Sequence, residues 1–338
     1  MKVEQSRGYS LALLCSLSGH SRQAYYKRRL IQEKEPLKEE LIIQQVLDCR
    51  QLQPRIGGRK LFFLLSPFMK RHHMDMGRDA FFTMLGNYDL LNKRSRRKPR
   101  TTDSNHRMKK YDNLIKEMIP TCSDQLWVSD ITYLMLKEKD VFLSLVTDAF
   151  SRKIVGFHVS ESLGADGTIL ALQMAIGGRK NLEGLIHHSD RGTQYCSERY
   201  VNALKDCKIS ISMTQGGDPR DNAIAERVNG ILKMELLQPI FEDLGAAILA
   251  VTQAVNIYNF LRPHSSISML TPALVHGRDI KVKRCWKYYY RSMRQNKADI
   301  VINKKEPLFK RKKSSKKKKT CSDVDNAIAL PTSEHDKQ

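Results

Sequence analysis

Alternating apolar and polar residues are clearest between residues 123 and 277. Short runs rich in β-branched and aromatic residues predict strands near residues 126–136, 141–148, 153–160, 184–189 and 209–213. Apolar residues at helical spacing predict helices near residues 165–176, 197–206 and 243–260. A further helix after Pro219 carries Ile224, Val228, Ile231 and Leu232 on one face. Strands followed by alternating helices and strands indicate an α/β domain.

The first 92 residues show only helical patterns. Residues 10–29 predict two short helices around Gly19, with Ser21 as the cap of the second. Such a pair is typical of a small helix-turn-helix unit, although an amphipathic pair that merely packs has the same pattern. Three more helices are predicted in the ranges 41–52, 61–65 and 78–85. The charged segment Glu33–Glu40 contains Pro36 and is predicted to be a linker. The segment Pro67–Met76 is predicted to be irregular.

Two strongly basic segments flank the α/β domain. Lys93–Arg100 has six basic residues in eight, and Lys304–Lys319 has ten basic residues and one Glu. We expect the first to belong to a linker, partly helical near Tyr111–Met118, and the second to a largely disordered tail. The predicted organisation is therefore two helix-turn-helix-like segments (1–35 and 36–92), a basic linker (93–122), the α/β core (123–277) and a basic tail (278–338).

The charge balance points to a polyanionic partner. The 338 residues include 58 Lys and Arg against 36 Asp and Glu, a formal net charge of +22, and nucleic acid is the commonest partner for such a chain. The sequence shows no apolar run approaching 18 residues and no signal-peptide core, so we expect no membrane association. The seven scattered cysteines form no Cys-x-x-Cys motif, which favours free thiols in the cytoplasm.

Three acids stand out as candidates for chemistry. Asp130 lies within a β-rich run, on the same face as Val128 and Thr132, where an acid is costly unless it is paired or bound to a metal. Asp190 follows a predicted strand, and Glu226 lies on the polar face of the helix that follows, with 35 residues between the two acids. A site with only carboxylate oxygens suits Mg²⁺ or Mn²⁺ and not zinc.

Two other groups near these acids have plainer interpretations. Asp148 and Arg152 are expected to form a structural ion pair. His188 precedes Asp190 by two residues, and the sequence is equally consistent with a role in orienting that acid and with a capping role.

Five motifs, in order, resemble the DDE transposases of the insertion-sequence-three family, which are relatives of retroviral integrases. The motifs are WVSDITYL (127–134), VTDAFSRKIVGF (146–157), HHSDRGTQY (187–195), SMTQGGDPRDNAIAERVNGILKME (212–235) and YNFLRPH (258–264). The order Asp130, Asp190, Glu226 and the 35-residue gap between the last two follow the family pattern, and Lys233 stands where the family has Lys or Arg. The paired His and Cys residues that bind zinc in retroviral integrases are absent around His72-His73.

The resemblance implies a ribonuclease H-like core, with a mixed five-stranded sheet and helices, preceded by small all-α helix-turn-helix segments. It implies a polynucleotidyl transferase that cleaves and joins DNA strands at the ends of an insertion sequence, with Asp130, Asp190 and Glu226 as catalytic residues and ligands of two Mg²⁺ or Mn²⁺ ions. The residues that we expect to contact DNA are Lys233, Asn222, Arg227, Arg262, Arg59 and Lys60.

The expected partners are double-stranded DNA, further copies of the chain and a transposase protein from an upstream reading frame. Two other functions share parts of the pattern. A plain ribonuclease H-like nuclease needs the same acids but not Lys233 or the helical segments. A catalytically inactive DNA-binding remnant needs the positive charge and not the acids, and the intact triad argues against it.

Overall fold

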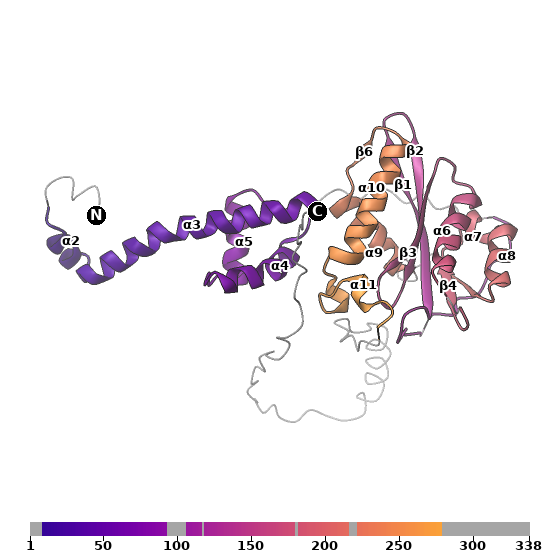
Figure 1. The fold of residues 1–338 in the computed structure, drawn as a ribbon, viewed down its shortest axis with the longest axis horizontal. Coiled ribbons are helices and arrows are strands. Elements are labelled where there is room, and N and C mark those ends of the chain that lie inside the picture. The colour runs from indigo at the N-terminus through magenta and orange to yellow at the C-terminus, as the bar shows by residue number, and fades with distance from the viewer. Residues whose placement is uncertain (1–8, 93–105, 117, 180–181, 216–221, 279–338) are drawn as a thin grey trace, which may run out of the picture. The chain divides into compact units, whose positions relative to one another are not determined.

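The structure is a computed structural model, and it describes residues 9–92, 106–116, 118–179, 182–215 and 222–278 (Figure 1). Three expectations therefore fall outside the described residues. These are the basic run Lys93–Arg100, the helix start at Asp218-Pro219, and the tail beyond residue 278. Everything below concerns the described part of the chain.

The N-terminal part is helical, as the sequence predicts. Its helices are α2 (Leu11–Leu17), α3 (Arg22–Leu52), α4 (Gly58–Arg71) and α5 (Arg78–Asn87). Gly19 adopts a left-handed conformation between α2 and α3, and the Ser21 hydroxyl accepts a hydrogen bond from the Ala24 N–H at the start of α3. The second half of α3 packs with α4 and α5 around a cluster that includes Ile42, Leu61 and Phe81.

Two local predictions in this part are wrong. Helix α3 runs without a break through Pro36, where a linker was expected, and α4 runs through Pro67 to Arg71, where the chain was expected to be irregular. Proline in a helix interior costs about 3 kcal/mol, so a proline is a reasonable local stop signal. In α4 the penalty is offset by tertiary packing, because Leu61, Leu65 and Met69 on both sides of Pro67 are buried on one face.

The core is built on one mixed sheet. Its strands are β1 (Leu126–Leu136), β2 (Asp140–Asp148), β3 (Ile154–Ser160), β4 (Ile186–Ser189), β5 (Ser210–Met213) and the two-residue β6 (Ile240–Phe241). The order is β3-β2-β1-β4-β5, with β6 paired to the end of β1. Strands β1, β2 and β3 are antiparallel, and β4, β5 and β6 are parallel to their neighbours. This is the ribonuclease H-like fold, with one short strand added to the five that were expected.

Helices cover both faces of the sheet (Figure 1). One face carries α6 (Ala165–Gly177), α7 (Thr193–Cys196) and α8 (Glu198–Asp206), and the other carries α9 (Ala223–Ile231) and α10 (Leu244–Asn256). The alternation along β1 separates the two sides: Trp127 packs in the cluster of α6 and α8, whereas Val128 and Leu134 pack on the side of α9. The chain continues from α9 into a π-helical turn, η1 (Leu232–Leu236), and from α10 into a second one, η2 (Ile257–Leu261). The described core ends with the short helices η3 (Ser265–Ile267) and α11 (Pro272–Val275).

Residues 106–116, together with Met118, lie against the core. Tyr111 packs against the cluster of α6 and α8, and Ile115 and Met118 pack against Leu126 and Val128. The Leu114 N–H donates to the Ser212 hydroxyl at 2.9 Å, and the Met213 N–H donates to the Asp112 carbonyl. The helix expected near Tyr111–Met118 is wrong, since the described residues there form turns.

The expectation that the chain has no long apolar run is wrong for residues 244–267. By length and composition alone this stretch is able to cross a membrane. In the structure it comprises α10, η2 and η3, and its residues Val251, Val255 and Tyr258 are buried in the main core cluster beside strands β1–β3. This packing is that of a core helix.

Gly156 marks the closest approach of the sheet to α6. A Cβ atom at this position in β3 would lie 2.1 Å from the Ala171 carbonyl oxygen and 2.9 Å from the Ala175 nitrogen, both of them helix backbone atoms. We predict that Gly156→Ala destabilises the protein by about 3 kcal/mol in urea unfolding, because the helix must move away from the sheet.

Gly177→Ala, at the end of the same helix, is the matched control, because a Cβ atom there meets nothing within 4 Å. Its effect should stay under about 1 kcal/mol. Equal stability of wild type and Gly156→Ala would mean that α6 does not lie this close to β3.

Candidate active site

Asp130 occupies the middle of the central strand, on the face that α9 covers. Both oxygens of its carboxylate are held: the Ile131 N–H donates to Oδ1 at 3.0 Å, and the side-chain amide of Asn229 donates to Oδ2 at 2.8 Å. The face shared with Val128, predicted from the alternation, is confirmed, because Val128 packs against Ala225 of α9. The carboxylate therefore has a fixed orientation, with lone pairs left for a further ligand.

Asp190 reaches Asp130 through the pairing of parallel strands. Val128 of β1 is opposite His188 of β4, and the same register continued by two residues brings Asp190 alongside Asp130. Neighbouring strands lie about 4.8 Å apart, so the two acids are adjacent. Asp190 directly follows the end of β4, as predicted, and the Gly192 N–H donates to its Oδ1 at 3.0 Å.

The two adjacent acids disturb each other's ionisation. Burial, and next the charge of Asp190, raise the pKa of Asp130 to about 7, while the hydrogen bonds from Asn229 and Ile131 act in the opposite direction. Glu226 adds a smaller effect of the same sign as Asp190. The raised pKa of Asp130 therefore reflects its burial first and the negative charge of the neighbouring acids second.

Glu226 comes from α9, on the stripe of that helix that faces β1. Its neighbours on the stripe, Asn222 and Asn229, donate to β1 at Ser129 O (2.9 Å) and at Asp130 Oδ2. The Glu226 side chain itself is exposed. The apolar stripe predicted for the helix is confirmed, since Val228 and Ile231 are 1% and 2% exposed.

The donor set fits a divalent cation. All three candidate ligands are carboxylates, and oxygen donors of this kind suit Mg²⁺ or Mn²⁺. The three are not in closest contact, however. Among the described residues, the possible ligand atoms that all lie within 4.8 Å of one another belong to Asp124, Asp148 and His276. Repulsion between carboxylates is a sufficient reason for the wider spacing of the triad.

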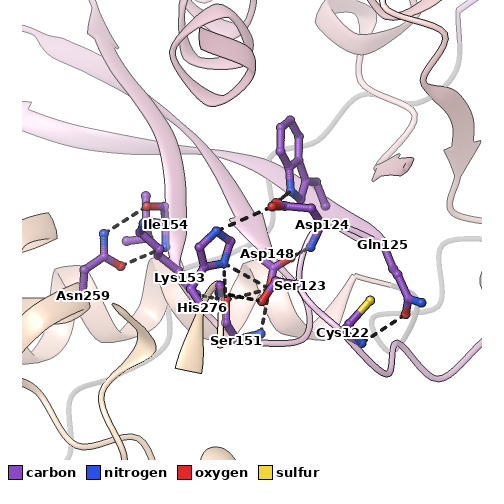
Figure 2. A network of polar contacts seen from close by, with 12 residues as sticks. Cys122, Ser123, Asp124, Gln125, Asp148, Ser151, Lys153, Ile154, Asn259 and His276 are labelled. Atoms are coloured by element: carbon purple, nitrogen blue, oxygen red, sulfur yellow. Dashed lines mark hydrogen bonds and ion pairs between the residues drawn. The ribbon is translucent and has the colours of Figure 1, made fainter. Parts of the chain in front are cut away.

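The Asp124–Asp148–His276 cluster is a separate network, at the end of β1 and β2 where Trp127 pairs with Asp148 (Figure 2). The Asp148 carboxylate is fully buried and accepts hydrogen bonds from the Ser151 hydroxyl and N–H and from the Asp124 N–H. Burial pushes the pKa of Asp148 upward, but hydrogen bonds from His276, Ser151 and Asp124 outweigh it, and the pKa lies below its ordinary value.

A cation already stands in this second cluster. The Arg179 guanidinium lies 2.9 Å from an Asp124 oxygen and 2.7 Å from His276 Nε2. A metal ion would have to displace Arg179, so the cluster is a structural network that joins the end of α11 to the sheet. The expected ion pair of Asp148 with Arg152 stays a prediction. The Arg152 Nε–H donates to the Ser266 hydroxyl at 3.2 Å, and the backbone N–H of Arg152 donates to the Asp148 carbonyl at 2.9 Å.

Four of the six residues expected to contact DNA are engaged within the protein. Arg262 is 1% exposed and binds both oxygens of Glu235, at 2.8 and 3.0 Å. Lys60 lies 3.4 Å from the same carboxylate. Asn222 donates to the Ser129 carbonyl, and Lys233 donates to the Thr132 hydroxyl at 3.1 Å and to the Tyr133 carbonyl. The side chains of Arg59 and Arg227 are exposed.

Sequence reasoning missed the residues that hold the acids in place. The sequence pattern gave Asn229 no role, although its amide donates to Asp130 Oδ2. Its helical spacing of three from Glu226 was the available signal. His188, left open between two roles, places Nδ1 2.8 Å from the Ser212 hydroxyl.

The comparisons with known proteins point to one family. Residues 120–219 match a family model described as "Integrase core domain", and residues 207–272 match a second model with the same description. Together the two matches include Asp130, Asp190 and Glu226.

The relatives carry the names of insertion elements. The chain is 31% identical over 271 residues to the "Insertion element IS600 uncharacterized 31 kDa protein" of Shigella sonnei, which covers 77% of this chain and 96% of that protein. It is 33% identical over 178 residues to the transposase for insertion sequence element IS629 of Shigella sonnei, and 35% identical over 179 residues to transposase InsF for insertion sequence IS3A of Escherichia coli K12. These two matches cover 52% of this chain, and 60% and 62% of the relatives.

Solved structures similar to the chain include the HTLV-2 integrase catalytic core domain in complex with magnesium, at 21% identity and a TM-score of 0.36. That match covers 46% of this chain and 97% of that one. A simian T-cell lymphotropic virus intasome in complex with a PP2A regulatory subunit matches at 18% identity and a TM-score of 0.42, and the match covers 70% of this chain and 76% of that one. The assignment of the family rests on the sequence relatives, above all on the IS600 protein, which is matched over almost its whole length. This chain belongs to the insertion-sequence-three family of DDE transposases, with an integrase core domain.

Proposed function

We propose that this chain cleaves and joins DNA strands at the ends of an insertion sequence, with Asp130, Asp190 and Glu226 as the ligands of divalent metal ions. The observation that carries the proposal is the parallel register of β1 and β4, which sets Asp130 and Asp190 side by side. Burial, and next the charge of Asp190, raise the pKa of Asp130 to about 7. Two adjacent carboxylates, one of them with a raised pKa, are expected of a metal site.

The protein's own groups prepare this site in three ways. The Ile131 N–H and the Asn229 amide hold the two oxygens of Asp130, and the Gly192 N–H holds one oxygen of Asp190. Helix α9 carries Glu226 on its β1-facing stripe. When bound, Mg²⁺ or Mn²⁺ ions would activate an attacking hydroxyl and stabilise the leaving oxygen of a phosphodiester. Asp130 must lose its proton to serve as a ligand, so metal binding should weaken as the pH falls below neutral.

The remaining parts of the proposal concern DNA and assembly. We assign contacts with the DNA backbone to the exposed Arg227, next to Glu226, and to the exposed Arg59 of the helical segment, since phosphate is the partner that Arg suits. The helical segments 1–35 and 36–92 would bind double-stranded DNA. The packing of Tyr111 and Ile115 suggests that the core begins near residue 106 and not at residue 123. We further propose that copies of the chain assemble on DNA, with an upstream-frame protein, in the bacterial cytoplasm.

The direct test is to incubate the purified chain with labelled element ends and Mn²⁺ or Mg²⁺. Cleavage followed by joining is the expected result. Cleavage without joining would indicate a nuclease, and DNA binding without either reaction would indicate an inactive remnant. Either of these outcomes would overturn the proposal.

We predict that Asp130→Asn, Asp190→Asn and Glu226→Gln each lower cleavage and joining more than about a hundredfold. Loss of an outer-shell partner alone costs 10–100-fold, and these variants remove a ligand itself. DNA affinity without metal should stay within about twofold of wild type. The matched control is Glu242→Gln, which neutralises an exposed carboxylate that is paired with Lys137. Near-normal joining by any of the three triad variants would contradict the assignment.

Metal-free stability should depend on pH through Asp130. Its pKa is raised from 3.8 to about 7 in the folded protein, so the folded state keeps a proton that the unfolded state releases, and stability falls as the pH rises from about 4 to about 7. In urea unfolding with a chelator at pH 8, Asp130→Asn should therefore be more stable than wild type. We expect the free energy of unfolding of Asp130→Asn to exceed that of wild type by about 2 kcal/mol at pH 8. This is roughly half of the value that the full pKa difference of Asp130 gives, because its side chain is only partly buried and solvent screens the effect.

At pH 4 this advantage should largely vanish, since Asp130 is then protonated in the folded state. Glu242→Gln again serves as the control and should show no such pH dependence. An Asp130→Asn variant less stable than wild type at pH 8 would show that the carboxylate is stabilised, not strained, without metal.

A further inference from the structure

One polar stripe of α9 and η1 faces β1. Asn222, Glu226, Asn229 and Lys233 follow each other at intervals of four, three and four residues, which is one face of a helix. Apart from Glu226, each of these side chains donates a hydrogen bond to β1. The acceptors are the Ser129 carbonyl for Asn222 (2.9 Å), Asp130 Oδ2 for Asn229 (2.8 Å), and the Thr132 hydroxyl (3.1 Å) and Tyr133 carbonyl for Lys233.

These bonds form a ladder between the helix and the strand. The helix residues advance in the same order as their partners along β1, so α9 and η1 are tied to the strand at successive points. The apolar side of α9, with Val228 and Ile231, also packs toward the sheet. Apolar packing is non-directional, whereas hydrogen bonds fix rotation and sliding, so the ladder sets where a side chain of this helix points.

The two asparagines lie in costly positions. Each is 6% exposed, and in each the Oδ1 atom is buried without a protein partner among the described residues. A buried polar atom without a partner costs about 1–3 kcal/mol, and an apolar residue would pack there without this cost. This loss of stability is explained if the amide donors of the two asparagines serve to position the helix and not to stabilise the fold.

We propose that Asn222, Asn229 and Lys233 are positioning residues that clamp α9 to β1 and thereby keep Glu226 on the side of the helix that faces β1 and Asp130. Glu226 lies between Asn222 and Asn229 on the stripe, so the two nearest bonds bracket it. The inference rests on the proposed function, because it concerns the ligand set of that metal site. It gives Lys233 a place in the clamp through its bonds to Thr132 and Tyr133.

The test measures Mn²⁺ binding to the purified full chain by electron paramagnetic resonance, which detects the unbound ion. The variants are Asn222→Ala, Asn229→Ala and Lys233→Met, and Lys233→Arg is the conservative replacement that keeps a donor. Gly230→Ala is the matched control, because it lies on α9 and a Cβ atom there meets nothing within 4 Å. DNA affinity is measured in parallel with a chelator present.

We expect each of the three variants to weaken Mn²⁺ binding about tenfold or more, with DNA affinity unchanged. Joining should recover partly at raised Mn²⁺ concentration. Gly230→Ala and Lys233→Arg should bind Mn²⁺ nearly as wild type does. If an alanine variant fails to fold, Asn229→Ser, which keeps a smaller polar group, replaces it and should show a weaker effect in the same direction.

Two results would overturn the inference. Unchanged Mn²⁺ binding in Asn229→Ala would show that the amide does not position the site. Reduced DNA affinity with unchanged Mn²⁺ binding in Lys233→Met would make Lys233 a phosphate contact. The variant Asp130→Asn, measured alongside, separates failure of the clamp from failure of the proposed function. If Asp130→Asn also binds Mn²⁺ as wild type does, the assignment of the metal site is itself wrong.

Discussion

The pairing of two carboxylates on adjacent parallel strands is the constraint on which the rest of the core depends. Asp130 and Asp190 come together because β4 pairs with β1 in a register that continues from Val128 and His188. Burial and the neighbouring charge of Asp190 raise the pKa of Asp130, so ionising Asp130 costs free energy at this position. A protein retains such a cost only where the surrounding structure holds the groups in place.

The surrounding structure supplies directional hydrogen-bond donors to the two carboxylates. Backbone N–H groups of Ile131 and Gly192 and the Asn229 amide point at the two carboxylates, and the sheet provides the rigid frame. Helix α9 adds the third acid and is itself held beyond its end. There η1 places Glu235 against Arg262, which follows η2, in a two-oxygen ion pair that is almost wholly buried on the Arg262 side. π-Helical turns often occur at functional sites, and here one directly follows each of the two helices on this face of the sheet.

The Asp124–Asp148–His276 network shows that residue type alone does not decide whether a group of acids is a metal site. Its ligand atoms are closer together than those of the triad, yet hydrogen-bond donors surround Asp148 (Figure 2), and the Arg179 guanidinium pairs with Asp124. The pKa of Asp148 is lowered, whereas that of Asp130 is raised. The difference lies in what surrounds each acid: hydrogen-bond donors around Asp148, and a second acid beside Asp130.

The sequence by itself determined most elements of the core and the identity of its three acids. Period-two alternation predicted the bounds of β1 correctly, because each face of that strand packs against a different cluster. The apolar face of α9 followed from the helical spacing of its apolar residues. Local pattern failed at Pro36 and Pro67, where helices run on through a residue that usually ends them. Tertiary structure alone decided which groups meet: Asn229 with Asp130, His276 with Asp148, and Lys233 and Arg262 with protein acceptors where DNA was expected. These partners are 27 to 128 residues apart in the chain, and pairing at that separation is set by sheet register and helix packing, which no local pattern encodes.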